Sequence, residues 1–166
     1  MTSDRRHYLR IDNRLLHGQV VQFWIPYLEI EHLIIADDLA AANPAMSTVY
    51  RMAVPRRIRL SVVSIIELAQ AAREENALPT LIILSDIFDL ARAFMSGFHC
   101  PRITLGNIHS AIGRNRITDT IYLTPEEKHA LAQFHRDGRV VEIQTFPGEP
   151  LRLSLGKSGA LEWERA

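Results

Sequence analysis

The sequence is poor in several features that would place it in a particular class of protein. It has one cysteine in 166 residues, Cys100, so an internal disulfide is excluded and a reducing compartment is expected. Its unbroken apolar runs fall far short of the roughly 20 residues that cross a bilayer, and its first residues lack the apolar stretch of a secretory signal. The patterns Gly-x-x-x-x-Gly-Lys and Gly-x-Gly-x-x-Gly are both missing, which argues against a nucleotide-binding loop.

The chain also lacks an excess of charge of either sign. Its 19 Lys and Arg residues balance 19 Asp and Glu residues, which argues against a general binder of nucleic acid. The hydrophobic fraction of 47% is that of an ordinary folded domain. Together these features predict a soluble cytoplasmic domain. Overall neutrality still allows a local anion site, which we expect where Arg10 and Arg14 lie beside His17.

Short apolar runs alternate with longer amphipathic stretches, and this alternation predicts an α/β fold. We expect strands at 7–11, 33–36, 58–63, 81–84, 103–105, 121–123 and 140–145, and helices at 18–28, 39–53, 65–76, 87–97 and 125–138. Strands that are apolar at consecutive positions are typical of parallel sheets covered on both faces. The order therefore predicts an open, mostly parallel central sheet of about six or seven strands with helices on both faces. One domain is expected over 1–147, and 148–166 is a C-terminal tail of uncertain structure.

Several residues mark where the helices begin, end or bend. Ser64 and Thr124 are expected N-caps, and Gly97 and Gly138 lie where glycine commonly follows the last turn of a helix. Pro26 falls inside the first expected helix and should bend it or end it early, because proline has no amide hydrogen to donate.

Ligands of such sheets bind at the carboxyl ends of the strands. In this chain that edge should hold the segment 10–19, the acids Asp37 and Asp38, the pair Ser85 and Asp86, and the loop 106–110 with His109. The acids could shape the site or simply cap a helix, and His109 could contact the phosphoryl group or substrate or be an ordinary loop residue. No set of histidines and cysteines has the spacing of a metal site, so no metal is expected.

The segment 10–19 carries the most chemical information. His17 lies just before a helix start, where free amide groups and the helix dipole favour an anion. Imidazole is a competent nucleophile when an acceptor holds its second nitrogen, a role that Asp12 could fill. Arg14 offers a planar fork suited to phosphate oxygens, and Gly18 would let the backbone approach a phosphoryl group. On spacing alone, however, His17 could be a solvated turn residue, with Arg14 paired to Asp12 or Asp38.

A family resemblance favours the phosphoryl interpretation. The run RIDNRLLHGQV at 10–20, followed by Trp24, is similar to the phosphorylation-site signature of the IIB components of the mannose/fructose/sorbose family of the bacterial phosphotransferase system. That signature usually reads R-[IV]-D-[DS]-R-L-[IL]-H-G-Q-V. The similarity continues in order through 34–38, 52–55, 106–109 and 121–127, and covers roughly 7–147.

The resemblance implies a phosphocarrier enzyme with no cofactor. A separate IIA protein would phosphorylate His17, and His17 would pass the group to a sugar that enters through the membrane proteins IIC and IID. Arg14 and Asp12 would assist catalysis, and family accounts place the phosphoryl group on the ring nitrogen nearer the main chain. The residues expected to bind the phosphoryl group or substrate are Arg10, Asn13, Gly18, Gln19, Asp37, Asp38 and His109. The protein would be peripheral to the inner face of the membrane, with no nucleic-acid partner, and could form a homodimer.

Departures from the family pattern keep other interpretations open. Asn13 stands where a second aspartate is most often seen, and the C-terminal segment does not resemble the terminal helix expected. An orphan regulatory domain, phosphorylated on His17 but unable to phosphorylate a sugar, is the main alternative. A non-catalytic domain that binds a phosphorylated metabolite is another. A response-regulator receiver is disfavoured, because the position after the third strand reads Val62-Val63-Ser64 and holds no phosphoacceptor aspartate.

Overall fold

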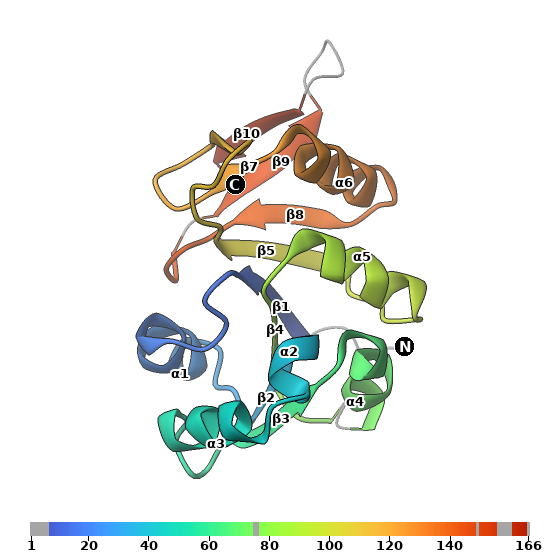
Figure 1. The fold of residues 1–166 in the computed structure, drawn as a ribbon. Coiled ribbons are helices and arrows are strands. Elements are labelled where there is room, and N and C mark those ends of the chain that lie inside the picture. The colour runs from blue at the N-terminus through green and yellow to red at the C-terminus, as the bar shows by residue number, and fades with distance from the viewer. Residues whose placement is uncertain (1–6, 75–76, 149, 156–160, 166) are drawn as a thin grey trace.

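The computed structural model describes residues 7–74, 77–148, 150–155 and 161–165 (Figure 1). Its main sheet has eight strands in these parts of the chain, in the order β10-β9-β8-β5-β1-β4-β2-β3. The strands are β1 (His7–Asp12), β2 (His32–Ala36), β3 (Arg59–Val63), β4 (Thr80–Leu84), β5 (Arg102–Asn107), β8 (Val140–Ile143), β9 (Leu151–Leu155) and β10 (Leu161–Arg165). All neighbours from β3 to β8 are parallel, and β9 and β10 add antiparallel pairs at one edge. The predicted mostly parallel α/β fold is confirmed.

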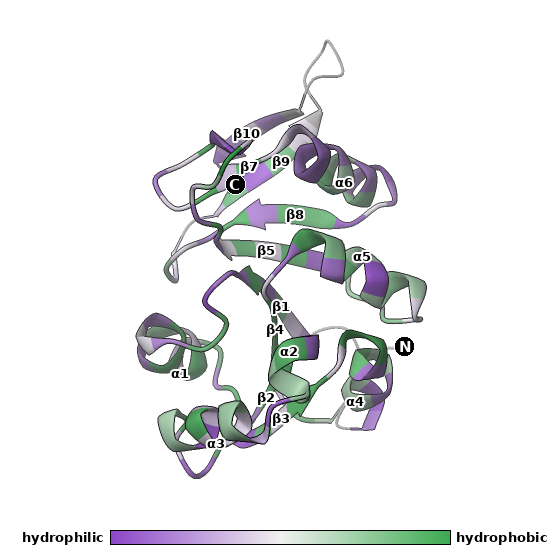
Figure 2. Ribbon diagram, viewed as in Figure 1, coloured by the Kyte–Doolittle hydropathy of each residue, from purple (hydrophilic) through white to green (hydrophobic). Residues whose placement is uncertain are grey.

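Alternating side chains divide the core between the two faces of the sheet. Leu9, Ile82 and Leu84 face the helices α4 (Leu68–Glu74), α5 (Ile87–Met95) and α6 (Pro125–Arg136). Leu81 and Ile83 face the opposite side, where the first helix and α3 (Pro44–Ala53) pack. Every residue of β2 and β4 is buried. Figure 2 shows hydrophilic residues among the hydrophobic ones on β8 and β9. Burial on both faces explains the continuous apolar runs of the central strands.

The first helix differs from a regular α-helix before Pro26, as a widened turn, whereas a bend or an early end was expected. Helical structure begins at residue 18, widens into the π-helical turn η2 (Val20–Trp24) and ends with the short α1 (Ile25–Tyr27). Ile25 N–H donates to the carbonyl of Val20, five residues back, in place of the usual four. A proline at 26 removes one amide donor and crowds the preceding turn, so the widened turn that precedes it relieves the crowding.

Two other elements differ from the prediction. The helix expected at 39–53 is two helices, α2 (Asp38–Ala41) and α3, because Asn43 caps a new start and Pro44 occupies its first turn. The strand expected at 121–123 does not join the main sheet as a ladder strand. Instead β7 (Tyr122–Leu123) pairs antiparallel with β6 (Asn115–Arg116), and only a single bridge joins Ile121 to Ile108.

Local capping signals agree with the structure. Thr124 accepts the amide of Glu127 at 3.1 Å and donates its own amide to the Glu127 carboxylate at 2.8 Å. Ser64 precedes the short helix η3 (Ile65–Glu67) and donates its amide to Glu67. The segment assigned to a tail contributes strands β9 and β10, while residues 149, 156–160 and 166 lie outside the described part of the chain.

Candidate functional site

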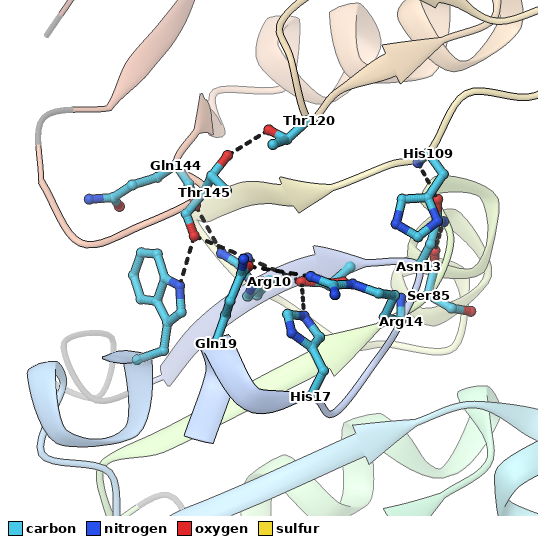
Figure 3. Close-up of polar contacts among 12 residues, drawn as sticks. Arg10, Asn13, Arg14, His17, Gln19, Ser85, His109, Thr120, Gln144 and Thr145 are labelled. Atoms are coloured by element: carbon cyan, nitrogen blue, oxygen red, sulfur yellow. Dashed lines mark hydrogen bonds and ion pairs between the residues drawn. The ribbon is translucent and has the colours of Figure 1, made fainter. Parts of the chain in front are cut away.

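The loop that carries His17 connects the end of β1 to the first helix (Figure 3). Leu15 closes its first turn, because its amide donates to the carbonyl of Asp12 at 2.9 Å. The backbone of Leu15 has a φ of 54°, which is uncommon for a residue with a Cβ, and its side chain is buried. Packing of that side chain into the core therefore holds the loop in a shape that open solvent would not favour. The carbonyl of His17 then accepts the first amides of the helix, those of Val20 and Val21.

Asp12 fixes the orientation and the tautomer of His17. The carboxylate is fully buried, and its Oδ2 lies 2.8 Å from Nε2 of the imidazole. Since an ionised carboxylate can only accept, Nε2 carries the hydrogen, and Nδ1 keeps its lone pair. Nδ1 has no hydrogen-bond partner and is covered from solvent, although 12% of the side chain is exposed. The site thus presents one imidazole nitrogen that is held and one that is unused, as a nucleophile requires.

Arg10 holds the same Asp12 oxygen that contacts the imidazole. Its Nε and Nη2 donate to the same Asp12 oxygen at 3.2 and 3.1 Å, and its Nη1 donates to the carbonyl of Gln144 at 2.9 Å. The guanidinium also stacks on Trp24, 4.9 Å from the ring centroid. Burial lowers the pKa of Arg10, an effect that the Asp12 carboxylate opposes. Arg10, which was predicted to bind the phosphoryl group, here contacts Asp12 and the backbone carbonyls of Gln144 and Thr145.

Arg14 and Gln19 lie on the solvent side of the loop. The amide of Arg14 donates to Oδ1 of Asp12 at 3.1 Å, and its exposed guanidinium contacts Oε1 of Gln19 at 3.4 Å. Next to them, the position that a Cβ of Gly18 would occupy is empty to 4 Å. The amides of Gly18 and Gln19 precede the first intrahelical bonds, so they are free to bind an anion. An exposed cation, free amides and open space surround the same short segment as His17.

Asn13 connects this loop with two other loops at the carboxyl edge. Its Nδ2 donates to the carbonyl of Ser85 after β4 at 2.7 Å, and its Oδ1 accepts the amide of His109 after β5 at 2.8 Å. The imidazole of His109 is exposed, and only backbone atoms of that residue join this network.

The two acids that follow β2 cap helices. Asp37 accepts the amide of Ala40 at 2.8 Å as the N-cap of α2, and its second oxygen accepts from the Ser85 hydroxyl at 3.2 Å. Asp38 accepts the amide of Ile65 and pairs with Arg92, each within 2.9 Å. These bonds lower the pKa of Asp38, the backbone bond to Ile65 contributing most. Of the two roles that the sequence left open for these acids, shaping the site or capping a helix, the structure shows the capping contacts.

The sequence-based prediction missed three residues that hold the site together. The carbonyl of Thr145 accepts from the Trp24 indole at 3.1 Å and from Arg10 at 3.4 Å. The hydroxyl of Thr145 lies 2.6 Å from that of Thr120. A Cβ at Gly106 would overlap the Arg10 guanidinium. Two-residue alternation along a strand places Arg10 and Asp12 on one face, which could have suggested their pairing, whereas nothing local points to Thr145.

Two classes of feature are missing from the described parts of the chain. Among residues 7–74, 77–148, 150–155 and 161–165, no cluster of three His, Cys, Asp or Glu side chains could hold a metal ion. Within the same residues, no helix is long and apolar enough to span a membrane.

Comparisons with known proteins agree on one family. The family model described as the PTS system sorbose subfamily IIB component matches residues 6–152. The N-acetylgalactosamine-specific phosphotransferase enzyme IIB component 2 of Escherichia coli K12 is 25% identical over 144 residues, or 85% of this chain and 90% of that protein. The fructose-specific EIIB component of Bacillus subtilis is 21% identical over 142 residues, or 84% and 87% of the two chains. The crystal structure of the N-acetylgalactosamine-specific IIB component 1 from E. coli shares the fold, with a TM-score of 0.80, 20% identity, and coverage of 97% of this chain and 98% of that one.

The family match includes the His17 loop and all six parallel strands of the main sheet. The chain therefore belongs to the sorbose-subfamily IIB components, the phosphotransferases of the sugar phosphotransferase system.

Proposed function

We propose that His17 accepts a phosphoryl group on Nδ1 from a phosphohistidine of a IIA protein and passes it to a sugar that enters through IIC and IID. In this role the protein acts at the inner face of the membrane. The observation that carries the proposal is the 2.8 Å bond from Nε2 of His17 to buried Asp12, which leaves Nδ1 as the only ring nitrogen with a free lone pair.

Each transfer is a displacement at phosphorus. The Nδ1 lone pair forms a new N–P bond, and the N–P bond of the donor breaks, its electron pair returning to the donor imidazole. The His17 ring then carries both the phosphoryl group and the Nε2 hydrogen, so it gains positive charge, which the Asp12 carboxylate stabilises. In the second transfer a sugar hydroxyl attacks phosphorus, the N–P electron pair returns to Nδ1, and the hydroxyl proton is released to water.

Positioning and charge account for most of the rate of phosphoryl transfer, and the loop offers both. The Arg14 guanidinium and the amides of Gly18 and Gln19 can bind the phosphoryl oxygens as charge develops on them. Nδ1 is covered in this state, so neighbouring groups must move aside before the phosphoryl group can enter. Arg14 suits such a movement, since its side chain is exposed and its contact with Gln19 is long at 3.4 Å.

Labelling tests the proposal. The protein is incubated with labelled phosphoenolpyruvate, the general phosphotransferase proteins and a IIA protein. We expect an acid-labile, alkali-stable label that is lost in His17→Ala and kept in His129→Ala, which alters an exposed histidine of α6. Nitrogen NMR of the labelled protein should place the phosphoryl group on Nδ1.

Two results would contradict the proposal in different ways. A label that survives His17→Ala would exclude His17 as the carrier. A label lost in that variant, but never delivered to a sugar in membranes that contain IIC and IID, would favour a regulatory carrier.

A further inference from the structure

Asn13 uses both ends of its side-chain amide, and its partners fix which end is which. The Ser85 carbonyl can only accept, so the NH₂ group of Asn13 must face it, at 2.7 Å. The amide of His109 can only donate, so the oxygen of Asn13 must face it, at 2.8 Å. Both ends of the amide are therefore tied to neighbouring loops, and one N–H of the NH₂ group is left over.

The oxygen of Asn13 also leads to a buried ion pair. Nη1 of Arg114 lies 3.4 Å from it and 3.0 Å from the carbonyl of His109. The rest of the guanidinium pairs with Glu127, whose carboxylate is 3% exposed and lies 2.6 Å from Nη2. Glu127 in turn caps α6 through the Thr124 amide. The contact is therefore anchored in a helix that is far from His17 in sequence.

Asn13 directly follows Asp12, so its contacts affect the position of the Asp12 carboxylate. Its neighbour Asp12 holds Nε2 of His17, and its own amide donates to the carbonyl of Asn107 on β5 at 2.9 Å. Arg10 therefore holds the Asp12 side chain. The next residue, Asn13, is bonded to the loop after β4 and to β5. A shift of Asn13 would move the Asp12 carboxylate and with it the imidazole.

We propose that Asn13 is a positioning residue for phosphoryl transfer, and that its amide sets the place of the Asp12–His17 pair by donating to Ser85 and accepting from His109 and Arg114. The inference rests on the proposed role of His17. It also gives a physical meaning to the asparagine at this position. A carboxylate would keep the bonds from His109 and Arg114 but would place a second acceptor against the Ser85 carbonyl.

The experiment measures single-turnover transfer from phosphorylated IIA to the full chain, over a range of IIA concentrations. Asn13→Ala removes both bonds, and Asn13→Asp keeps the shape but loses the donor. For Asn13→Ala we expect the maximal rate to fall about tenfold or more, since small displacements at a reacting group have effects of this size. Asn13→Asp keeps the acceptor for His109 and Arg114 and restores the residue most often seen at this position, so its rate should fall less. The IIA concentration at half-maximal rate should change little. The NMR signal of the His17 Nε2 hydrogen should shift or broaden in both variants.

A matched control separates positioning from loss of stability. Asn43 is an exposed asparagine that caps α3 through the amide of Ala45. Asn43→Ala should lower Tm but leave the maximal transfer rate and the His17 signal unchanged, and Asn43→Asp should change none of these. Wild-type rates and His17 signals in both Asn13 variants would overturn the positioning role. It would also be overturned if Asn43→Ala and Asn13→Ala lowered Tm equally and lost the same amount of transfer rate. Failure of the proposed function looks different, because the wild type would then take no label or His17→Ala would keep it.

Discussion

Gly106 offers a severe test of how the site is built. The residue lies on β5 directly beneath the Arg10 guanidinium, and a methyl group at its Cα would overlap Cζ and two of the nitrogens. Arg10 is 1% exposed and holds Asp12 with two donors, so it has no room to retreat without breaking those bonds. Gly106→Ala should therefore leave the buried Asp12 carboxylate without its cation.

The size of the effect follows from the cost of breaking a buried ion pair. Removing one partner of such a pair typically costs about 3–5 kcal/mol. In a chain of this length, each kcal/mol lowers Tm by roughly 2–4 °C, so Tm should fall by about 6–20 °C. Urea unfolding and calorimetry measure the change, and transfer assays below the new Tm should show a matching loss of activity.

Gly18→Ala is the control for this prediction. The added methyl meets no atom within 4 Å, and Gly18 is at the start of a helix, where alanine is tolerated. Its free energy of unfolding should stay within about 1 kcal/mol of wild type. If Gly106→Ala unfolds with the same free energy as wild type, then Arg10 is not packed against β5 as described, and the argument that it holds Asp12 fails.

Three further substitutions test other parts of the site. Asp12→Asn should lower the transfer rate by about two to four orders of magnitude, because the hydrogen on His17 is no longer held on Nε2, and rapid-quench kinetics would detect a smaller loss. Arg14→Ala should slow transfer while changing stability by less than about 0.5 kcal/mol, because the side chain is exposed; unfolding on this change would make Arg14 structural. Asp38→Asn should lower stability at neutral pH without slowing transfer. Because the folded pKa of Asp38 lies below its ordinary value, the wild-type advantage should be full above that ordinary value and vanish as pH falls through the folded pKa, as urea titrations at several pH values would show.

Local signals predicted several helix boundaries, although the new start at Asn43 and Pro44 was missed. The run that begins at Thr124 predicts a cap, and Thr124 and Glu127 form it between residues three apart. Gly138 follows α6 with a φ of 88°, as expected of a glycine after a last turn. Pro26 follows a widened turn, whereas a bend or an early end was expected. In each case the interacting groups lie within about one turn of each other, so the local sequence contains everything that decides the outcome.

Patterns of a few residues did not predict which strands would pair. The strand expected at 121–123 forms β7, but its partner is β6 and not the main sheet. Strand propensity shows that a segment favours an extended shape, but the choice of partner depends on which strand the fold brings beside it. The same holds for the segment after 148. Its strand β9 pairs with β8, for example Leu151 with Ile143, and the local sequence did not predict this partner.

By itself, the sequence determined the parallel α/β architecture, the family signature around His17 and the caps of the helices, because apolar periodicity and short motifs act over a few residues. The tertiary structure alone decided which candidates meet at the site. Asp12 and Asn13 hold the His17 loop, Asp38 caps a helix, and Arg10 reaches the carbonyl of Thr145, 135 positions away. The physical reason is that a parallel sheet brings strand ends from distant parts of the chain to one edge, where each polar group pairs with whatever the neighbouring loops present.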